Sequence, residues 1–272
     1  MKLLIDAGNT RIKLAAWSAP DGRARDVLSL AHEDIPTVLP GWLAAQQAPF
    51  RQACGVNVAG TALGQRLTAT LADAACTLAW LKPTASALGL QNGYDTPEQL
   101  GADRWAALLG IWHKHRQSGA PLLLATFGTA TTIDAIHPDG RFLGGLILPG
   151  AAMMRRSLAQ GTAQLPLASG DLRPFPTNTH DAISSGMAAA QAGAVLRQWL
   201  TLREHCRATP QLFVSGGNWP QLAGEVEKLL QDLAQLAGLA PIVPQAVPHA
   251  VLDGLAYLAG HACLPATPQT AD

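Results

Sequence analysis

The sequence has little of what marks disulfide-rich, zinc-binding or nucleic-acid-binding proteins. Only four of its 272 residues are cysteines, and no Cys-x-x-Cys pair occurs among Cys54, Cys76, Cys206 and Cys263. This scatter favours free thiols in a reducing cytoplasm over a disulfide framework or a zinc site. Lysine plus arginine equals aspartate plus glutamate at 19 each. The balanced charge therefore indicates neither nucleic acid nor an anionic membrane as a main partner.

Long apolar runs are also missing. The nearest approach to one, residues 144–154, is short and contains Pro149, so we expect no membrane-spanning helix. Asp6 interrupts the one candidate signal-peptide core and no cleavage-like site follows it, so we expect a cytoplasmic protein without a targeting segment. Hydrophobic residues nevertheless make up 48% of the chain. That share is enough for a substantial core in one large domain or two of ordinary size.

Two stretches of the sequence share one pattern, in which an apolar run, a small turn and a second apolar run follow each other. They read LLIDAGNTRIKLAAW at 3–17 and LLLATFGTATTIDAI at 122–136. The pattern predicts a β-hairpin in each stretch. Because each hairpin precedes further strands and alanine-rich helical stretches, the sequence predicts two related α/β halves, 1–118 and 119–272.

Further elements are predicted from periodicity and turn residues. A turn signal at 137–141 predicts a third strand at Phe142–Leu148. Residues 211–218 read as a short strand that ends in a glycine turn. Apolar spacing predicts helices at 97–117, at 180–203 with Thr179 as the cap, and at 221–237.

The first hairpin places a carboxylate directly before its turn. Gly8 lets the backbone approach a ligand closely, and consecutive N–H groups in such a turn can form an anion-binding nest. The two polar residues after Gly8 add hydrogen-bond donors, and Arg11 or Lys13 could add positive charge. Asp6 could hold Mg²⁺, which prefers carboxylate oxygens and keeps several waters. The alternative is an ordinary hairpin whose Asp and Asn only build the turn.

The second hairpin repeats the small residues and hydroxyls but not the acid. Residues 127–131, FGTAT, form its turn, and Thr126 aligns with Asp6 of the first hairpin. Two such loops, one from each half, could hold a polyphosphate between them. A plain hairpin is again the alternative.

A third candidate site is the start of the helix predicted at 97–117. Asp103 could accept a proton from a substrate hydroxyl, and Arg104 could hold a carboxylate in a bidentate pair. The alternative is that Asp103 serves the helix dipole and Arg104 is solvated.

Together these motifs resemble those of the type III pantothenate kinases, in the superfamily of acetate kinases, sugar kinases and actin. The resemblance implies an α/β fold with two related halves of the actin-like ATPase (ribonuclease H-like) type, mixed sheets flanked by helices, and an active site in the cleft between the halves. The matching motifs follow the family's order: DAGNTRIK at 6–13, GYDTPEQLGADR at 93–104, FGTATTID at 127–134, GGLILPG at 144–150, TNTHDAISSG at 177–186 and SGGN at 215–218.

The resemblance also implies a reaction and its residues. The reaction is ATP-dependent phosphorylation of pantothenate to 4′-phosphopantothenate, the first step of coenzyme A biosynthesis, by a homodimer. Asp103 is the expected general base, and Asp6 is the expected Mg²⁺ ligand. The residues implied to bind ATP are Asp6, Ala7, Gly8, Asn9, Thr10, Arg11, Ile12, Lys13 and Thr129. Those implied to bind pantothenate are Tyr94, Gly101, Ala102, Asp103, Arg104 and Thr179.

Thr126 departs from the family pattern. The family commonly has an Asp before the second loop, where it helps to bind an activating monovalent cation, potassium or ammonium. A neutral hydroxyl is a poorer cation ligand than a carboxylate, so we expect weak or altered potassium dependence. The SGGN turn also departs modestly, because the family tends toward Thr at position 215 and Asp at position 218. A second hypothesis is therefore a catalytically weak, nucleotide-binding regulatory or accessory protein of this fold. A third is another kinase or hydrolase of the same superfamily, such as a sugar kinase.

Overall fold

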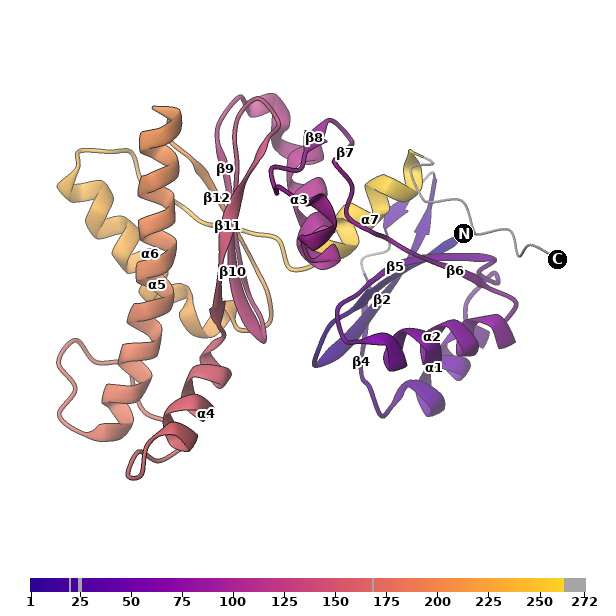
Figure 1. The fold of residues 1–272 in the computed structure, drawn as a ribbon, viewed down its shortest axis with the longest axis horizontal. Coiled ribbons are helices and arrows are strands. Elements are labelled where there is room, and N and C mark those ends of the chain that lie inside the picture. The colour runs from indigo at the N-terminus through magenta and orange to yellow at the C-terminus, as the bar shows by residue number, and fades with distance from the viewer. Residues whose placement is uncertain (20, 24–25, 168, 262–272) are drawn as a thin grey trace. The chain divides into compact units, whose positions relative to one another are not determined.

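The computed structural model describes residues 1–19, 21–23, 26–167 and 169–261 (Figure 1). They form two compact units. The first comprises Met1–His115 together with 249–261, and the second comprises Arg116–Pro248. Each unit contains one mixed β-sheet and its covering helices, and the first unit also has a two-stranded antiparallel sheet of β7 (Ser86–Ala87) and β8 (Leu90–Gln91). No helix in the described part of the chain is long and apolar enough to cross a membrane.

The sheet of the first unit is built around the first predicted hairpin. Strand β1 pairs antiparallel with β2 and parallel with β5, and β5 pairs parallel with β6. The strand order is β3-β2-β1-β5-β6, and β4 also pairs with β2. The strands are β1 (Lys2–Ala7), β2 (Arg11–Ser18), β3 (Gly22–Arg23), β4 (Leu28–Ala31), β5 (Gln52–Asn57) and β6 (Thr77–Trp80).

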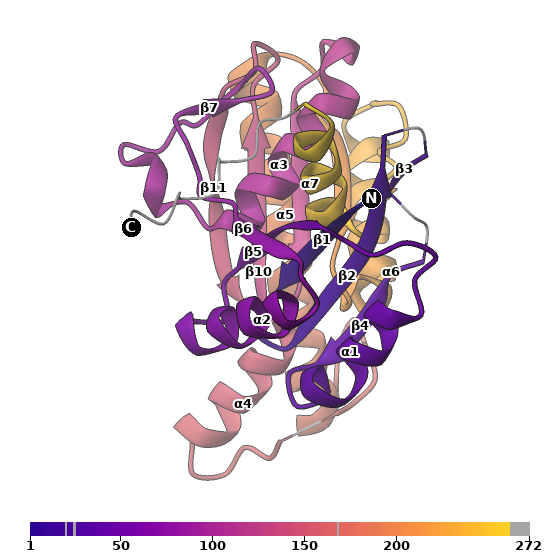
Figure 2. The same ribbon diagram turned by 90° about the vertical axis from the view of Figure 1, so that its right-hand side faces the viewer.

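Helices cover both faces of this sheet (Figure 2). Leu3 and Ile5 belong to the core under α1 (Ile35–Ala44) and α2 (Thr61–Asp73). Leu4 points to the opposite face because side chains alternate along a strand. On that face α3 (Ala102–His115) and α7 (Ala250–Gly260) contact β5 and β1. Burial on both faces explains why the whole run Leu3–Ile5 is apolar.

Two glycines allow α3 and α7 to cross at very short range. A Cβ on Gly110 would come within 2.8 Å of the Gly254 nitrogen, and one on Gly254 would overlap the Ala106 carbonyl oxygen. This contact joins residues 249–261 to the first unit. The sequence prediction differs here, since it assigned everything from residue 119 onward to the second half.

The second unit repeats the arrangement of the first. Its sheet has the order β11-β10-β9-β12-β13, in which β9 pairs antiparallel with β10 and parallel with β12. The strands are β9 (Leu122–Phe127), β10 (Ala130–Ile136), β11 (Phe142–Pro149), β12 (Gln211–Ser215) and β13 (Gln245–Ala246). The helices are α4 (Ala151–Gly161), α5 (Thr179–Cys206) and α6 (Trp219–Leu236). Helices α5 and α6 pack together, and their apolar side chains form one core with the sheet (Figure 1).

Most predicted elements are confirmed, and two details are wrong. Both hairpins and the strand from Phe142 occur as expected. The helix predicted at 97–117 is interrupted: a 3₁₀ turn, Pro97–Gln99, precedes α3, and another, Arg116–Ser118, follows it. Asn178 caps α5 in place of Thr179, because its side-chain oxygen accepts a hydrogen bond from the Asp181 nitrogen at 3.0 Å.

The crossing of α3 and α7 yields a stability prediction. Gly254→Ala adds a methyl group where the Ala106 carbonyl lies, so we expect a loss of about 1–3 kcal/mol in the free energy of unfolding. Gly224→Ala in α6 is the matched control, since its Cβ would meet nothing within 4 Å. The control should gain about 0.5–1 kcal/mol from helix propensity. Urea unfolding followed by tryptophan fluorescence measures both, and equal midpoints for Gly254→Ala and the parent would contradict this packing.

Candidate functional site

The turn between β1 and β2 is held from two sides. The Gly8 nitrogen donates to the Arg11 carbonyl at 3.1 Å and closes the turn. The His32 ring contacts the Gly8 carbonyl at 2.9 Å through Nε2, which must carry a hydrogen because the carbonyl only accepts. The tip of the turn, residues 9–10, is exposed. Its backbone is therefore positioned to meet a ligand from solvent.

The two basic residues after this turn have different partners. Arg11 donates to Ser29 on β4, from Nε to Oγ and from Nη2 to the carbonyl, both at 2.9 Å. Lys13 lies opposite Asp6 across the hairpin, and its Nζ is 3.8 Å from Asp6 Oδ2. Lys13 is therefore the cation that accompanies the carboxylate, whereas Arg11 ties the hairpin to the neighbouring strand.

Asp6 is a carboxylate at the buried end of β1. Burial raises its pKa from 3.8 to about 6, Lys13 opposes that rise, and the charge of Asp103 adds to it. The pKa thus shows that two of the predicted site carboxylates interact within the first unit. Burial, and to a lesser degree the charge of Asp103, makes ionisation of Asp6 costly unless a cation is near.

This carboxylate environment fits a magnesium ion. Mg²⁺ is usually bound by one or two carboxylates and completes its octahedron with waters and phosphate oxygens. Asp6 would be the protein ligand, as the resemblance implies. Across the residues that the structure describes, no group of three His, Cys, Asp or Glu could hold a metal by itself. A magnesium ion at Asp6 would therefore depend on water and substrate oxygens for the rest of its shell.

Asp103 lies in the first turn of α3, and the preceding chain leaves room for it. Its Oδ1 accepts a hydrogen bond from the Arg104 nitrogen at 2.8 Å. A Cβ at Gly101 would come within 2.7 Å of that same oxygen. A larger residue at position 101 would displace the carboxylate. This steric constraint explains why a glycine precedes Ala102 and Asp103.

Arg104 is buried rather than solvated, so the solvated alternative is wrong. Its side chain is 8% exposed, and Nη1 donates to the Tyr94 hydroxyl at 2.8 Å. Asn92 holds the loop that carries Tyr94, because its Oδ1 accepts from the Tyr94 nitrogen and its Nδ2 donates to the Pro97 carbonyl, both at 3.1 Å. Two residues predicted to bind substrate, Tyr94 and Arg104, are thus brought together.

In the second unit, three segments meet at the turn between β9 and β10. The Gly150 nitrogen donates to the Thr129 carbonyl at 3.0 Å. Asn218 donates twice, from its backbone to the Phe127 carbonyl at 3.1 Å and from Nδ2 to the Gly128 carbonyl at 3.0 Å. Sequence reasoning missed these supporting contacts, because they join residues that are far apart in the chain.

The same turn lies beside two helix starts. Gly150 is the N-cap residue of α4 and Asn218 is that of α6. The N-terminal end of a helix carries partial positive charge and favours anions. The exposed Thr129 therefore lies next to an anion-favouring region.

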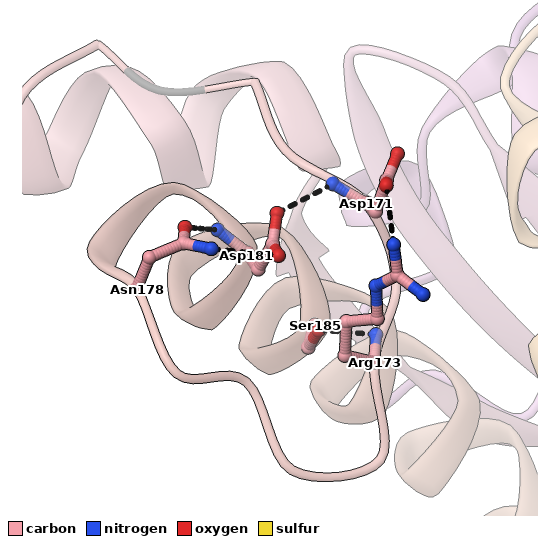
Figure 3. A network of polar contacts seen from close by, with 5 residues as sticks. All are labelled: Asp171, Arg173, Asn178, Asp181 and Ser185. Atoms are coloured by element: carbon pink, nitrogen blue, oxygen red, sulfur yellow. Dashed lines mark hydrogen bonds and ion pairs between the residues drawn. The ribbon is translucent and has the colours of Figure 1, made fainter.

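A hydrogen-bonded loop precedes α5 (Figure 3). Asp181 in the first turn of α5 accepts from the Asp171 nitrogen at 2.8 Å, and its own nitrogen binds the Asn178 side chain. Further along α5, Ser185 Oγ accepts from the Arg173 nitrogen at 2.9 Å. These bonds hold the loop against the first turns of the helix, where the predicted substrate residue Thr179 is the first helical residue.

Burial raises the pKa of each of the three described cysteines, so none of them is an activated nucleophile. Cys54, Cys76 and Cys206 are free thiols, and Cys263 lies outside the described residues. Burial raises the pKa of Cys54 to about 12, so its thiol stays protonated at neutral pH.

Comparison with known proteins shows which family this chain is similar to. The family model described as type III pantothenate kinase matches residues 2–201. The type III pantothenate kinase of Bordetella bronchiseptica is 48% identical over 96% of this chain and 98% of that protein. The type III pantothenate kinase of Bordetella petrii is 49% identical over 95% of this chain and 97% of that protein. The type III pantothenate kinase of an Azoarcus species is 41% identical over 95% of this chain and 90% of that protein.

Solved structures show the fold. A conserved candidate transcriptional activator of the Baf family from Campylobacter jejuni matches with a TM-score of 0.56 at 21% identity, over 96% of this chain and all of that one (100%). A candidate 2-dehydro-3-deoxygalactonokinase from Sinorhizobium meliloti matches with a TM-score of 0.55 at 16% identity, over 98% and 100%. At such identities the likeness shows the fold alone, which is the actin-like ATPase fold expected from the sequence.

The raised pKa of Asp6 predicts a stability change with a definite sign. The folded protein keeps a proton on Asp6 between pH values of about 4 and 6 where the unfolded chain has lost it. The contribution of Asp6 to stability therefore falls as the pH rises through this window, and its ionised form costs free energy above pH 6. We expect Asp6→Asn to raise the free energy of unfolding by about 1–3 kcal/mol at pH 8, with the gain shrinking toward pH 4.

Asp139→Asn is the control, and we expect it to change the free energy of unfolding in the opposite direction. Burial is the largest single effect and raises the pKa of Asp139, but the hydrogen bonds from His137 and the Arg141 nitrogen, together with the charges of both residues, lower it overall. Its ionised form is therefore favoured in the folded protein, and Asp139→Asn should lose stability at pH 8 rather than gain it. Urea unfolding at pH 4.5 and pH 8 compares the variants, and an Asp6→Asn gain that is independent of pH would contradict the electrostatic cause.

Proposed function

The chain belongs to the type III pantothenate kinase family, and from this we propose that it transfers the γ-phosphoryl group of ATP to the primary hydroxyl of pantothenate. The products are ADP and 4′-phosphopantothenate, and the reaction is the first step of coenzyme A biosynthesis. The observation that carries the proposal is 48% identity to a type III pantothenate kinase over nearly the full length of both chains. The contacts of the candidate residues give each of them a chemical role.

Each unit would offer phosphate oxygens a turn with backbone N–H groups, and the first unit adds a cation. In the first unit these are the exposed turn at 8–10 and the ammonium group of Lys13, and in the second unit the turn at Thr129 beside two helix starts. When bound at Asp6, Mg²⁺ would supply charge neutralisation at the phosphate oxygens. Asp6 would in turn ionise more readily, because the cation offsets the burial that raises its pKa.

Asp103 would act as the general base. Its Oδ1 is engaged by the Arg104 nitrogen, which orients the carboxylate and directs Oδ2 to the substrate hydroxyl. As the hydroxyl oxygen bonds to the γ-phosphorus, its proton passes to Oδ2, and the bond from phosphorus to the leaving ADP oxygen breaks. The protein contributes mainly positioning and charge stabilisation to such a transfer.

Arg104 and Tyr94 would recognise pantothenate at its other end. A guanidinium group matches a carboxylate with two parallel hydrogen bonds. The Tyr94 hydroxyl accepts one N–H of Arg104 and thereby fixes the plane of the guanidinium. Anchoring the pantothenate carboxylate there would orient the distant hydroxyl toward Asp103 on the preceding helical position.

The catalytic assignment is tested by Asp103→Asn. We expect this variant to bind ATP and lose about 10²–10⁴-fold in kcat, because Asn cannot accept the hydroxyl proton. Asp73→Asn, at the exposed end of α2, is the matched control and should keep the parent rate. A coupled assay of ADP release, with and without pantothenate, measures all three proteins.

Each outcome of that assay is informative. Pantothenate-dependent ADP release by the parent supports the kinase, and near-normal turnover by Asp103→Asn contradicts the general base. A folded parent that binds ATP but releases no ADP with pantothenate contradicts the kinase itself. It would instead support the nucleotide-binding regulatory protein considered from the sequence.

The homodimer expected from the resemblance has a candidate surface. Five of the exposed large apolar side chains come from one segment of the second unit, between β11 and the loop before α5: Ile147, Met153, Leu167, Leu172 and Phe175. We propose that this segment packs against a second copy of the chain, since exposed large apolar side chains that gather on one segment mark protein–protein interaction sites.

A single substitution tests this surface. Phe175 is 91% exposed, and Phe175→Asp should shift the mass measured by light scattering during gel filtration from dimer to monomer. Leu236→Asp, at an 88% exposed position at the end of α6, should leave the mass unchanged. A parent that elutes as a monomer at every concentration would contradict the dimer.

A further inference from the structure

All three carbonyl groups of the turn at 127–129 are hydrogen-bonded by N–H groups of the second unit itself. The Phe127 carbonyl accepts from the Asn218 nitrogen, the Gly128 carbonyl from Asn218 Nδ2, and the Thr129 carbonyl from the Gly150 nitrogen. The distances lie between 3.0 and 3.1 Å. The turn is therefore held from outside by donors, with Asn218 supplying two of the three.

The residues nearest this turn carry no negative charge, and the acid on β10, Asp134, lies farther along that strand. Residues 122–133, 142–151 and 211–220 contain neither Asp nor Glu. Within the sheet, Thr126 lies opposite Ser215 and Thr132, so a hydroxyl faces a hydroxyl where a carboxylate would stand in the family pattern. The two helix starts at Gly150 and Asn218 add partial positive charge.

These residues do not fit a monovalent cation. Such a cation needs several oxygen ligands with negative or partly negative charge. Here the turn carbonyls face N–H donors, the positions beside the turn are neutral, and two helix starts repel positive charge. The potassium or ammonium ion implied by the resemblance thus has no suitable ligand set at this turn.

Contacts of the residues on both sides of Asn218 fix its position at the turn, where its side chain could take the place of that ion. Gly216 has a φ of +95°, and a Cβ there would overlap the Phe127 backbone, so the chain before Asn218 packs directly against the turn. Trp219 on the other side stacks on Phe127, with ring centroids 5.6 Å apart. The Asn218 side chain makes no capping bond to its own helix and reaches to Gly128 instead.

We propose that Asn218 is a positioning residue whose side-chain amide takes the place of a monovalent cation at the second phosphate-binding turn. Its N–H group binds the Gly128 carbonyl as a cation would, and so orients the turn for ATP without potassium or ammonium. The inference rests on the proposed function, because it assumes that this turn binds ATP phosphates.

The difference between an Asn and an Asp side chain at position 218 provides a direct test of the proposal. An amide donates a hydrogen bond, whereas a carboxylate at neutral pH only accepts. Asn218→Asp would place a carboxylate oxygen against the Gly128 carbonyl, and the two would repel unless a cation lay between them. The substitution should therefore create a potassium requirement that the parent lacks.

Initial rates in sodium, potassium and ammonium salts of equal ionic strength test this expectation. The parent should differ by less than about twofold between salts. Asn218→Asp should show a KM for ATP raised about tenfold in sodium, as expected for one lost hydrogen bond, and largely restored by potassium or ammonium. Gln235→Glu, an exposed amide-to-carboxylate change on the same helix, should behave as the parent in every salt.

A second readout needs no catalysis. Potassium should raise the melting temperature of Asn218→Asp above its value in sodium, while the parent should melt at the same temperature in both. Asn218→Ala removes the donor without adding a charge. This variant should bind ATP more weakly than the parent, and potassium should not restore its affinity.

The outcomes separate this inference from the proposed function. A parent without pantothenate kinase activity in any salt overturns the function, whereas the melting comparison still reports on Asn218. Strong, saturable activation of the parent by potassium overturns the inference. So does an Asn218→Ala variant with the parent's affinity for ATP, or an Asn218→Asp variant whose melting temperature ignores potassium.

Discussion

Direct contact between backbone segments, made where glycine omits a side chain, is the constraint on which the arrangement of both units depends. Gly254 lets α7 lie against the Ala106 carbonyl and thereby joins the end of the described chain to the first unit. Gly216 lets the loop before α6 lie against Phe127 and brings Asn218 to its two carbonyl partners. Each contact places a group from one part of the chain against a turn or helix far away in sequence. A methyl group at either position would force these segments apart.

The two hairpin turns have similar topology and opposite electrostatics. In the first unit, Asp6 is buried beside Asp103, and the raised pKa of Asp6 records what it costs to ionise there. In the second unit, the turn is surrounded by N–H groups and two helix starts, with no acid among residues 126–133. An acidic turn suits a divalent cation, and a turn rich in donors suits phosphate oxygens.

Several features could be predicted because they depend on residues close in sequence. Hairpin strands are specified by alternation and turn residues, so both hairpins and the strand from Phe142 were found within a residue of their ends. The helix at 97–117 was predicted too long because its apolar spacing continues across Gly101, where the chain must instead leave room for the Asp103 carboxylate. The cap of α5 was misplaced by one residue, since both Asn and Thr are good caps and only the observed bond to Asp181 distinguishes them.

The sequence by itself determined which chemical groups this protein has and in what order. It placed an acid before the first turn, a Gly-Ala-Asp-Arg segment at 101–104, neutral residues at the second turn, and six motifs in a family's order. Only the tertiary structure decided which of them interact. It buried Arg104 under Tyr94, coupled Asp6 to Asp103, and gave Asn218 the carbonyl of Gly128 as a partner. The reason is physical: burial, pKa and hydrogen bonding depend on distances between residues remote in the chain, and local periodicity contains no information about them.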